Sequence, residues 1–293
     1  DNFKFYKLDI SKKSKIDNFF NKNKIDIIIN LAAYAGVQYS LKNPDVYFKT
    51  NEIGFYNILE NAKQRIEEMI SEWVDIIDVW WFSSRPWSIM PSVEEELSRI
   101  IPVLDILDTY NIPFSVDTCR NEVVRELLKY KNLLYINDIS WLKDEKILDL
   151  ISGTNIWYIL MHIQWNPLDM QVNPAYDDVV WEIYSFFEEK IKIIKEKWIS
   201  NIILDPWFGF WKTMEQNYEL LRNMNKFKSL WYDLLVWLSR KSMIWKLLNN
   251  SPDEILSETV ALNLFALEKW ADILRVHDIK EHKNIVKIFN ELK

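Results

Sequence analysis

Short apolar runs rich in β-branched residues alternate along this chain with longer amphipathic stretches. Apolar residues recur at helical spacing in the longer stretches, with charges on the opposite face. This alternation predicts an α/β fold with buried parallel strands. Eight strand–helix units fit a (β/α)₈ TIM barrel, and a doubly wound open sheet is the alternative. The predicted strands are residues 25–30, 74–79, 112–117, 133–137, 157–162, 201–205, 232–239 and 272–277.

Nearly every predicted strand ends on a polar side chain. In a barrel these ends converge on one mouth, where residues from different strands can meet one ligand. Strand capping and turn chemistry explain any single case, but the whole series favours a binding site. The residues are Asp78, Asp117, Asn137, Asp138, His162, Asp205, Ser239, Arg240, Lys241, Arg275 and His277.

Composition excludes several classes of function. The net charge of −7 argues against a nucleic-acid-binding surface, which needs a basic face. No apolar run reaches the roughly 18 residues of a membrane span, so no membrane partner is expected. The single cysteine, Cys119, cannot form an internal disulfide, and this favours a cytoplasmic location.

Glycine is scarce in this chain and tryptophan is abundant, with 4 and 15 residues respectively. Average usage gives roughly 20 glycines at this length, close to the two counts combined. Four tryptophans (Trp73, Trp198, Trp231 and Trp270) follow predicted helices, where the C′ position usually carries glycine in a left-handed conformation. Most of the others lie in or beside loops after strand ends, as in "DPWFGFWKT" from residue 205.

We therefore interpret most of these tryptophans as occupying glycine positions. The codon UGA is read as Trp in one genetic code and as Gly in another, used by some bacterial lineages. The alternatives are a genuine Trp-rich core or a sugar-stacking surface. Extra methylenes in a packed site cost about 1–3 kcal/mol. The combined cost of a dozen indoles at tight turns should therefore exceed the free energy of unfolding of a typical domain, which is about 5–15 kcal/mol.

With glycine restored, the motifs after residue 63 resemble the dihydropteroate synthase family. "DIIDVWWFSSRPWS" becomes DIIDVGGFSSRPGS, "DPWFGFWKT" becomes DPGFGFGKT, and "LVWLSRKSMIWKLL" becomes LVGLSRKSMIGKLL. "FSVDT", "YINDIS", "LMHIQWNP" and "RVHDIKE" need little change. The resemblance implies a pterin-binding barrel over residues 63–293. Such a barrel joins a pterin diphosphate to 4-aminobenzoate, assisted by Mg²⁺, and the family often forms homodimers.

The resemblance also implies roles for the residues of the pterin pocket. Asp117, Asn137 and Asp205 would read the pterin edge, because a buried carboxylate accepts two N–H groups at once. Lys241 would reach the pterin carbonyl and ring nitrogen, and Met161 would line the pocket. Lys212 and Lys241 have a simpler reading as solvated loop lysines.

The remaining roles concern the diphosphate and the aminobenzoate. Arg275 and His277 would hold the diphosphate and, with Lys241, carry the catalysis. Ser84 would contact the diphosphate and the aminobenzoate. Ser242, opening a helix, would meet the aminobenzoate carboxylate at free N–H groups. Three more residues would contact the aminobenzoate: Arg85, Pro86 and Phe210.

Cys119 and the glutamates 94–96 are expected to have structural positions only. Because the implied reaction needs no protein nucleophile, Cys119 is expected to be a small buried residue. The glutamates 94–96 are expected at the exposed start of a helix.

The first 62 residues depart from that family. The family's opening strand and metal-binding Asn are missing, so the metal ligand is unknown and Asn30 is a weak candidate. Residues 1–62 instead resemble a Rossmann-like fragment of an NAD-dependent sugar-nucleotide epimerase, but no Tyr-x-x-x-Lys pair follows. Either the gene is misjoined, or residues 25–30 supply barrel strand one. The functional alternatives are a non-catalytic chimera and a methyltetrahydrofolate methyltransferase-like barrel.

Overall fold

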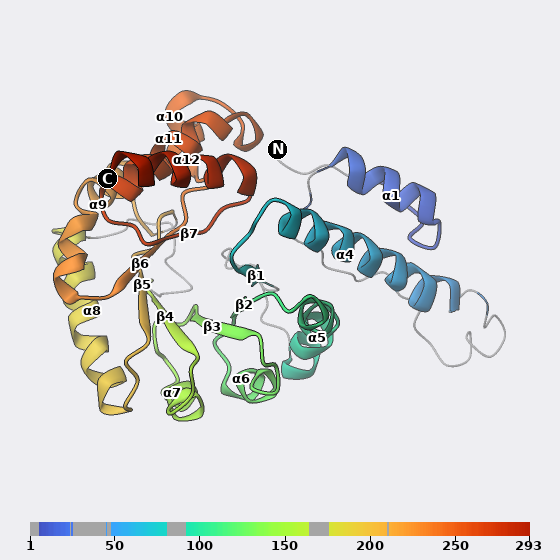
Figure 1. Cartoon of the computed structure of the whole chain (residues 1–293), viewed down its shortest axis with the longest axis horizontal. Coiled ribbons are helices and arrows are strands. Elements are labelled where there is room, and N and C mark those ends of the chain that lie inside the picture. Colours follow the sequence, from blue (N-terminus) through green and yellow to red (C-terminus); the bar gives the residue numbers. More distant parts are fainter. Residues whose placement is uncertain are drawn as a thin grey trace.

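The computed structural model describes residues 6–23, 25, 45, 48–80, 92–163, 176–209 and 211–293. Its centre is a curled sheet of seven parallel strands that pair in the order of the sequence (Figure 1). This confirms the α/β, barrel-like architecture expected from the alternation of apolar runs. The strands are β1 (Ile77–Val79), β2 (Phe114–Asp117), β3 (Leu133–Asp138), β4 (Trp157–Met161), β5 (Ile202–Asp205), β6 (Asp233–Val236) and β7 (Ile273–Leu274).

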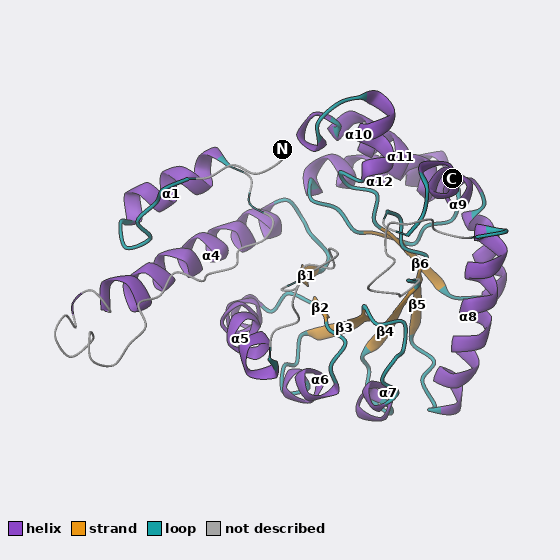
Figure 2. Ribbon diagram, turned by 180° about the vertical axis from the view of Figure 1, so that it is seen from behind, coloured by secondary structure: helices purple, strands orange, loops and turns teal. Residues whose placement is uncertain are grey.

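Helices follow each strand and lie around the outside of the sheet (Figure 2). They are α5 (Val93–Tyr110), α6 (Asn121–Leu127), α7 (Lys146–Ile151), α8 (Val179–Glu196), α9 (Met214–Arg222), α10 (Ser242–Leu248), α11 (Leu256–Glu268) and α12 (Ile279–Leu292). Short 3₁₀ segments, η2 (Met224–Leu230) and η3 (Pro252–Glu254), complete this part. Ser92 caps α5 by accepting the Glu95 N–H, as expected for a serine before an apolar-periodic run.

The period-two alternation of the strands separates two apolar layers. Ile202 and Leu204 of β5 face the helices in the main core, whereas Ile203 faces the barrel interior with Ile159 and Leu235. Asp205 follows Ile203 by two residues and so belongs to the interior face. The same register aligns Asp117 with Asn137 and Met161 with Asp205. Polar side chains at the strand ends are thereby gathered at one end of the barrel.

The strand predictions hold for seven of the eight runs, with differences at the ends. The run 232–239 pairs only over Asp233–Val236, and 272–277 only over Ile273–Leu274. Arg275 and His277 therefore lie beyond the strand. The eighth predicted strand, 25–30, falls outside the described residues except for Ile25. Within the described part of the chain, the outer edges of β1 and β7 have no strand partner.

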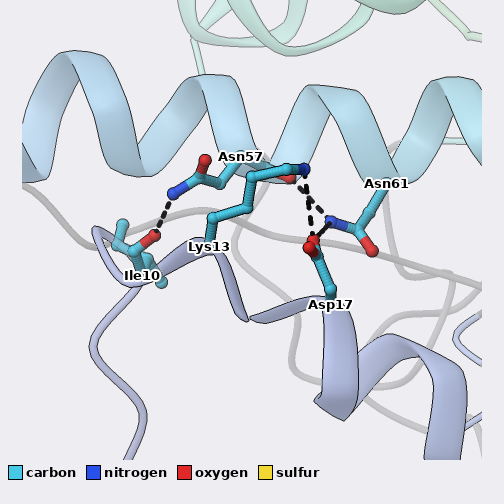
Figure 3. Close-up of polar contacts among 5 residues, drawn as sticks. All are labelled: Ile10, Lys13, Asp17, Asn57 and Asn61. Atoms are coloured by element: carbon cyan, nitrogen blue, oxygen red, sulfur yellow. Dashed lines mark hydrogen bonds and ion pairs between the residues drawn. The ribbon is translucent and has the colours of Figure 1, made fainter. Parts of the chain in front are cut away.

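The N-terminal part consists of α1 (Lys13–Lys22), the π-helical η1 (Phe48–Gly54) and α4 (Phe55–Ser71). Two buried asparagines of α4 hold α1: Asn57 donates to the Ile10 carbonyl at 2.8 Å, and Asn61 donates to Asp17 at 3.1 Å (Figure 3). Gly54 allows this approach, because a Cβ there would lie 2.6 Å from Ile10. Helix α4 runs unbroken across residues 62 and 63, then leads to β1.

The four tryptophans that follow helices all have left-handed backbones, as predicted. Their φ angles are 67°, 61°, 66° and 74° at Trp73, Trp198, Trp231 and Trp270, and the side chains are 77%, 90%, 91% and 63% exposed. After α4 the Trp73 N–H donates to Ile70 and the Val74 N–H to Met69, which is the Schellman pattern usually closed by glycine. We call these four residues the turn tryptophans.

No helix in the described ranges has the length and apolar character required to cross a membrane.

Candidate active site

The carboxyl ends of β1, β2 and β3 and the turn after β7 meet in a buried polar cluster. Asn137 donates its amide to Asp117 at 2.6 Å, and Arg275 donates to the other Asp117 oxygen at 3.0 Å. Arg275 also pairs with Asp78. The structure therefore brings together three residues to which the resemblance assigned roles, and adds Asp78 to them.

The electrostatics of this cluster follow from burial. Loss of water raises the pKa of Asp117 to about 7, and the neighbouring Arg275 only partly opposes this. Burial works against the charge of Arg275, but Asp117 and Asp78 outweigh it and raise the guanidinium pKa. Arg275 consequently stays cationic throughout the physiological range, which suits it to an anionic group.

Asp205, at the end of β5, forms the second half of the site. One of its oxygens accepts the Trp207 backbone N–H at 2.8 Å, and burial raises its pKa. The other oxygen is buried without a hydrogen-bond partner, and so is Oδ1 of Asn137, as far as the described residues go. Buried acceptors are usually satisfied. Two orphaned acceptors at one mouth indicate that a ligand with N–H donors belongs there.

Indole rings cover the cationic side of this site. The Lys241 ammonium lies 4.0 Å from the Trp207 ring centroid and 3.8 Å from that of Trp237. Arg275 lies 4.5 Å from the Trp237 ring and 5.8 Å from that of Trp80. Burial lowers the pKa of Lys241 to about 7, although Asp205 opposes the shift. Lys241 is only partly exposed, so the alternative reading of it as a solvated loop lysine is wrong.

The loop after β5 carries two of these indoles on left-handed backbone. Trp207 and Trp211 have φ angles of 52° and 66°, and both rings are buried. They pack with Met161, which the sequence placed in the pocket, and with Ile163. Trp207 Nε1 has no hydrogen-bond partner in the described structure. We call Trp80, Trp207, Trp211 and Trp237 the mouth tryptophans.

A cavity of about 1740 Å³ opens beside this cluster. Its wall includes Asn137, Lys241, Ser242, Arg275 and His277, and it continues along the open side of the sheet between β1 and β7. Ser242 is the first residue of α10, as predicted for a helix start. Asn30, Ser84, Arg85, Pro86 and Phe210 lie outside the described residues.

Three readings of single residues need correction. Lys212 is buried rather than solvated: its ammonium donates to the Trp207 carbonyl at 2.8 Å, and burial lowers its pKa to about 7. Glu96, expected at an exposed helix start, is buried and accepts from the Thr118 hydroxyl at 2.7 Å. Cys119, expected to be buried, is partly exposed. In each case the tertiary neighbours, which local sequence does not name, decide the exposure.

Sequence reasoning missed two residues of the site. Asp78 ended a predicted strand but received no role, although it pairs with Arg275. Asn217, in the first turn of α9, is buried and bonds the loop after β5. The polar end of the strand was the available signal for Asp78. No local pattern distinguished Asn217 from a surface asparagine.

The described residues do not make up a metal site by themselves. No group of three or more His, Cys, Asp or Glu side chains lies close enough together there to hold an ion. Asp78 and Asp117, two of the carboxylates at this mouth, are paired with Arg275. These residues therefore do not fit a resident Mg²⁺.

Comparisons with known proteins agree with this geometry. The pterin binding enzyme family matches residues 44–277, and the GDP-mannose 4,6 dehydratase family matches residues 1–72, in line with the epimerase-like resemblance of residues 1–62. The dihydropteroate synthase of Escherichia coli is 40% identical over 238 residues, covering 80% of this chain and 84% of that protein. That of Haemophilus influenzae is 34% identical, covering 82% and 88%.

Solved structures show the same likeness. Dihydropteroate synthase from Thermus thermophilus, in complex with 4-aminobenzoate, is 34% identical with a TM-score of 0.73, over 78% of this chain and 89% of that one. The Yersinia pestis enzyme, in a sulfonamide drug complex, is 34% identical with a TM-score of 0.75, over 80% and 86%. Sequence match, fold and polar mouth together show that this chain belongs to the dihydropteroate synthase family of pterin-binding enzymes.

Proposed function

We propose that the mouth of this barrel binds 6-hydroxymethyl-7,8-dihydropterin diphosphate and 4-aminobenzoate and condenses them to 7,8-dihydropteroate and pyrophosphate. The observation that carries the proposal is the pair of orphaned acceptors, Oδ2 of Asp205 and Oδ1 of Asn137. A pterin edge presents N–H donors in a row, and buried oxygens recognise such donors strongly. Asp117 and Met161 complete this pocket, and Lys241 supplies the donor for the pterin carbonyl.

The proposed chemistry needs no protein nucleophile. The bond between the pterin methylene carbon and the diphosphate oxygen breaks, and its electron pair leaves with the pyrophosphate. The neutral amine of 4-aminobenzoate then forms the carbon–nitrogen bond and loses one proton. Arg275 and His277 stabilise the departing charge, so the rate comes from positioning and electrostatics. Ser242 receives the aminobenzoate carboxylate at the start of α10, and Ser84, Arg85, Pro86 and Phe210 are assigned to its other contacts.

The mouth tryptophans do not suit this reaction. The rings of Trp207 and Trp237 stand on Lys241, and those of Trp80 and Trp237 stand on Arg275; these are the two cations assigned to the substrates. We therefore propose that the working protein carries glycine at most of the fifteen tryptophan positions, including the turn and mouth tryptophans. The left-handed backbones of Trp207 and Trp211 support this, since glycine adopts them without strain.

Four further expectations belong to the same proposal. Mg²⁺ is expected from the family, but because the described residues do not fit it, every step above uses only the chain's own groups. A homodimer is also expected from the family resemblance. The single cysteine favours a cytoplasmic location. We divide the chain into a fragment, 1–62, and a barrel, 63–293, with the boundary inside α4.

A coupled assay of pyrophosphate release tests the proposal on two proteins: the chain as printed and a fifteen-glycine variant, with Gly at every Trp position. The variant should release pyrophosphate only when both substrates are present, and the printed chain should not. Pterin binding without turnover in the variant would favour the non-catalytic chimera. Release with no requirement for 4-aminobenzoate would contradict the assigned reaction.

A further inference from the structure

The turn that follows β7 carries the two residues assigned to the diphosphate, Arg275 and His277. Its last bond to the sheet in the described structure is made by the Arg275 N–H, which donates to the Val236 carbonyl at 2.9 Å. The pairing of β7 with β6 ends there, so the later carbonyls of the turn need other partners where they are buried. The position of the turn therefore depends on the side chains that supply those partners.

Two helices supply them. His282, in the first turn of α12, holds its Nδ1 2.6 Å from the Asp278 carbonyl oxygen, and the Asn263 amide nitrogen lies 2.8 Å from its Nε2. An imidazole with its proton on Nδ1 satisfies both contacts, since it donates to the carbonyl and accepts from the amide. Arg65, from α4, donates to the His277 carbonyl at 3.3 Å. The contact of His282 is local to α12, whereas that of Arg65 joins residues 212 positions apart in the chain.

The guanidinium of Arg65 is oriented by a second bond. Its Nη1 donates to Glu68 of the same helix at 3.2 Å, while its Nη2 donates to His277. A guanidinium presents its donors in a rigid planar fork, so the bond to Glu68 directs the second nitrogen at the turn. The Arg65 side chain is only 27% exposed and lines the same cavity as Arg275 and His277. Arg65 is therefore a cation of the mouth as well as a support for the turn.

The groups assigned to the pterin edge do not depend on this contact. Asn137 lies in β3 and Asp205 ends β5, and the pairing of each strand with β4 fixes its register. In the part of the chain that the structure describes, the hydrogen bonds of Arg65 go to Glu68 and His277 alone. Loss of Arg65 should therefore weaken the binding of a diphosphate and leave recognition of the pterin ring in place.

We infer that Arg65 is a positioning residue for the diphosphate, because it holds the turn of Arg275 and His277 through the His277 carbonyl. The inference rests on the proposed function for its effect on ligands, and on the hydrogen bonds alone for its effect on the turn. It also gives α4, which spans residues 62 and 63, a part in the site. A residue that only stabilised the fold would change the affinities for a pterin with and without the diphosphate equally.

The test uses Arg65→Met in the fifteen-glycine variant, with Arg99→Met as the matched control. Methionine keeps an unbranched apolar stem and removes the guanidinium. Arg99 is 24% exposed, pairs with Glu95 on α5 and lies outside the described wall of the cavity, so R99M removes an equivalent cation and ion pair. In R65M the dissociation constant of the pterin diphosphate should rise at least tenfold, and that of 6-hydroxymethyl-7,8-dihydropterin less than twofold. R99M should leave both unchanged.

Arg65→Lys keeps a cation but lacks the planar fork, so R65K should show a smaller loss of the same selectivity, and it serves if R65M fails to fold. Hydrogen exchange at the Arg275 amide needs no ligand and should be at least tenfold faster in R65M than in R99M. If the fifteen-glycine variant does not bind the pterin diphosphate, the proposed function fails, and this exchange still tests the hold on the turn. Equal losses of affinity for the two pterins, or equal exchange in R65M and R99M, would overturn the inference.

Discussion

The turn tryptophans and the mouth tryptophans differ in what surrounds them, although Trp207 and Trp211 share their left-handed backbone. The turn residues stand in water, with Trp198 and Trp231 about 90% exposed. Trp207 and Trp211 are buried, and Trp207 and Trp237 stack on Lys241. At the turns the indole ring displaces no protein group, so the only destabilisation comes from the left-handed backbone of a residue with a Cβ. In the mouth the same ring occupies the space next to the charged groups of the site.

Because of this difference, replacing the two groups of tryptophans should affect different properties of the protein. Left-handed backbone costs a residue with a Cβ roughly 1–2 kcal/mol, and an exposed ring returns little of that. A buried indole returns apolar burial, at about 25 cal/mol per Å². We therefore expect glycine at the turns to stabilise the protein, and glycine in the mouth to change ligand binding more than stability.

The largest expected effect on stability comes from the four turns together. The variant W73G/W198G/W231G/W270G should have a free energy of unfolding about 4 kcal/mol higher than the printed chain. Each relieved left-handed residue contributes about 1 kcal/mol, after the entropy that glycine adds to the unfolded state, and distant sites add. Urea denaturation measures this value. The mouth variant W207G/W211G is the control and should change by less than half as much; equal gains would remove the distinction.

A second effect concerns Lys241, whose pKa of about 7 results from burial among the indoles. W207G/W237G should admit water and raise this pKa toward its usual value by about one unit or more, which corresponds to roughly 1.4 kcal/mol per unit. A ¹³Cε NMR titration of lysine gives the value directly. A pKa that stays near 7 would show that the rings are not the cause.

The same shift predicts how stability depends on pH. In the unfolded chain Lys241 and Lys212 hold their protons up to about pH 10, whereas in the folded chain each loses its proton near pH 7. The unfolded state therefore binds more protons between these values, and stability should rise with pH across that window. Unfolding curves from pH 7 to 10 check this. In W207G/W237G the rise should become smaller, because the shift of Lys241 shrinks while Lys212 keeps its own.

The smallest effect has the opposite sign and uses Trp181. This residue is 63% exposed but lies in the first turn of α8, where Asp178 accepts its N–H, its ring stacks on Tyr184 and its φ is not positive. Glycine at a helical position is destabilising by about 0.5–1 kcal/mol. W181G should therefore lower the free energy of unfolding by about 1 kcal/mol, whereas W198G should raise it by a similar amount. Stabilisation by both would mean that exposure, and not backbone conformation, decides.

Much of the barrel could be read from the sequence because strand–helix periodicity and helix-terminal positions are local signals. The left-handed backbone at Trp73 and Trp270 is an example: each follows an amphipathic run and precedes an apolar one. Strand ends were less accurate. Lys212 and Glu96 were misread because their burial depends on residues from other elements.

The part of the site that could be predicted is the part formed by residues at the ends of the parallel strands. Asp117, Asn137 and Asp205 end strands of one sheet, so the parallel register brings them to one mouth. Asn217 is different, because its role comes from a loop that folds back upon the helix following it. The stacking of indoles on Lys241 was also beyond local patterns, since Trp207 and Trp237 come from different strands' loops.

The affinity of the pterin diphosphate, measured by titration calorimetry on the printed chain and on W207G/W237G, addresses the central claim most directly. That claim is that the mouth indoles stand where the substrate belongs. We expect the double variant to bind at least a hundredfold more tightly, with the heat of binding lost when Asp205→Asn is added. Equal affinities in the two proteins would contradict the account.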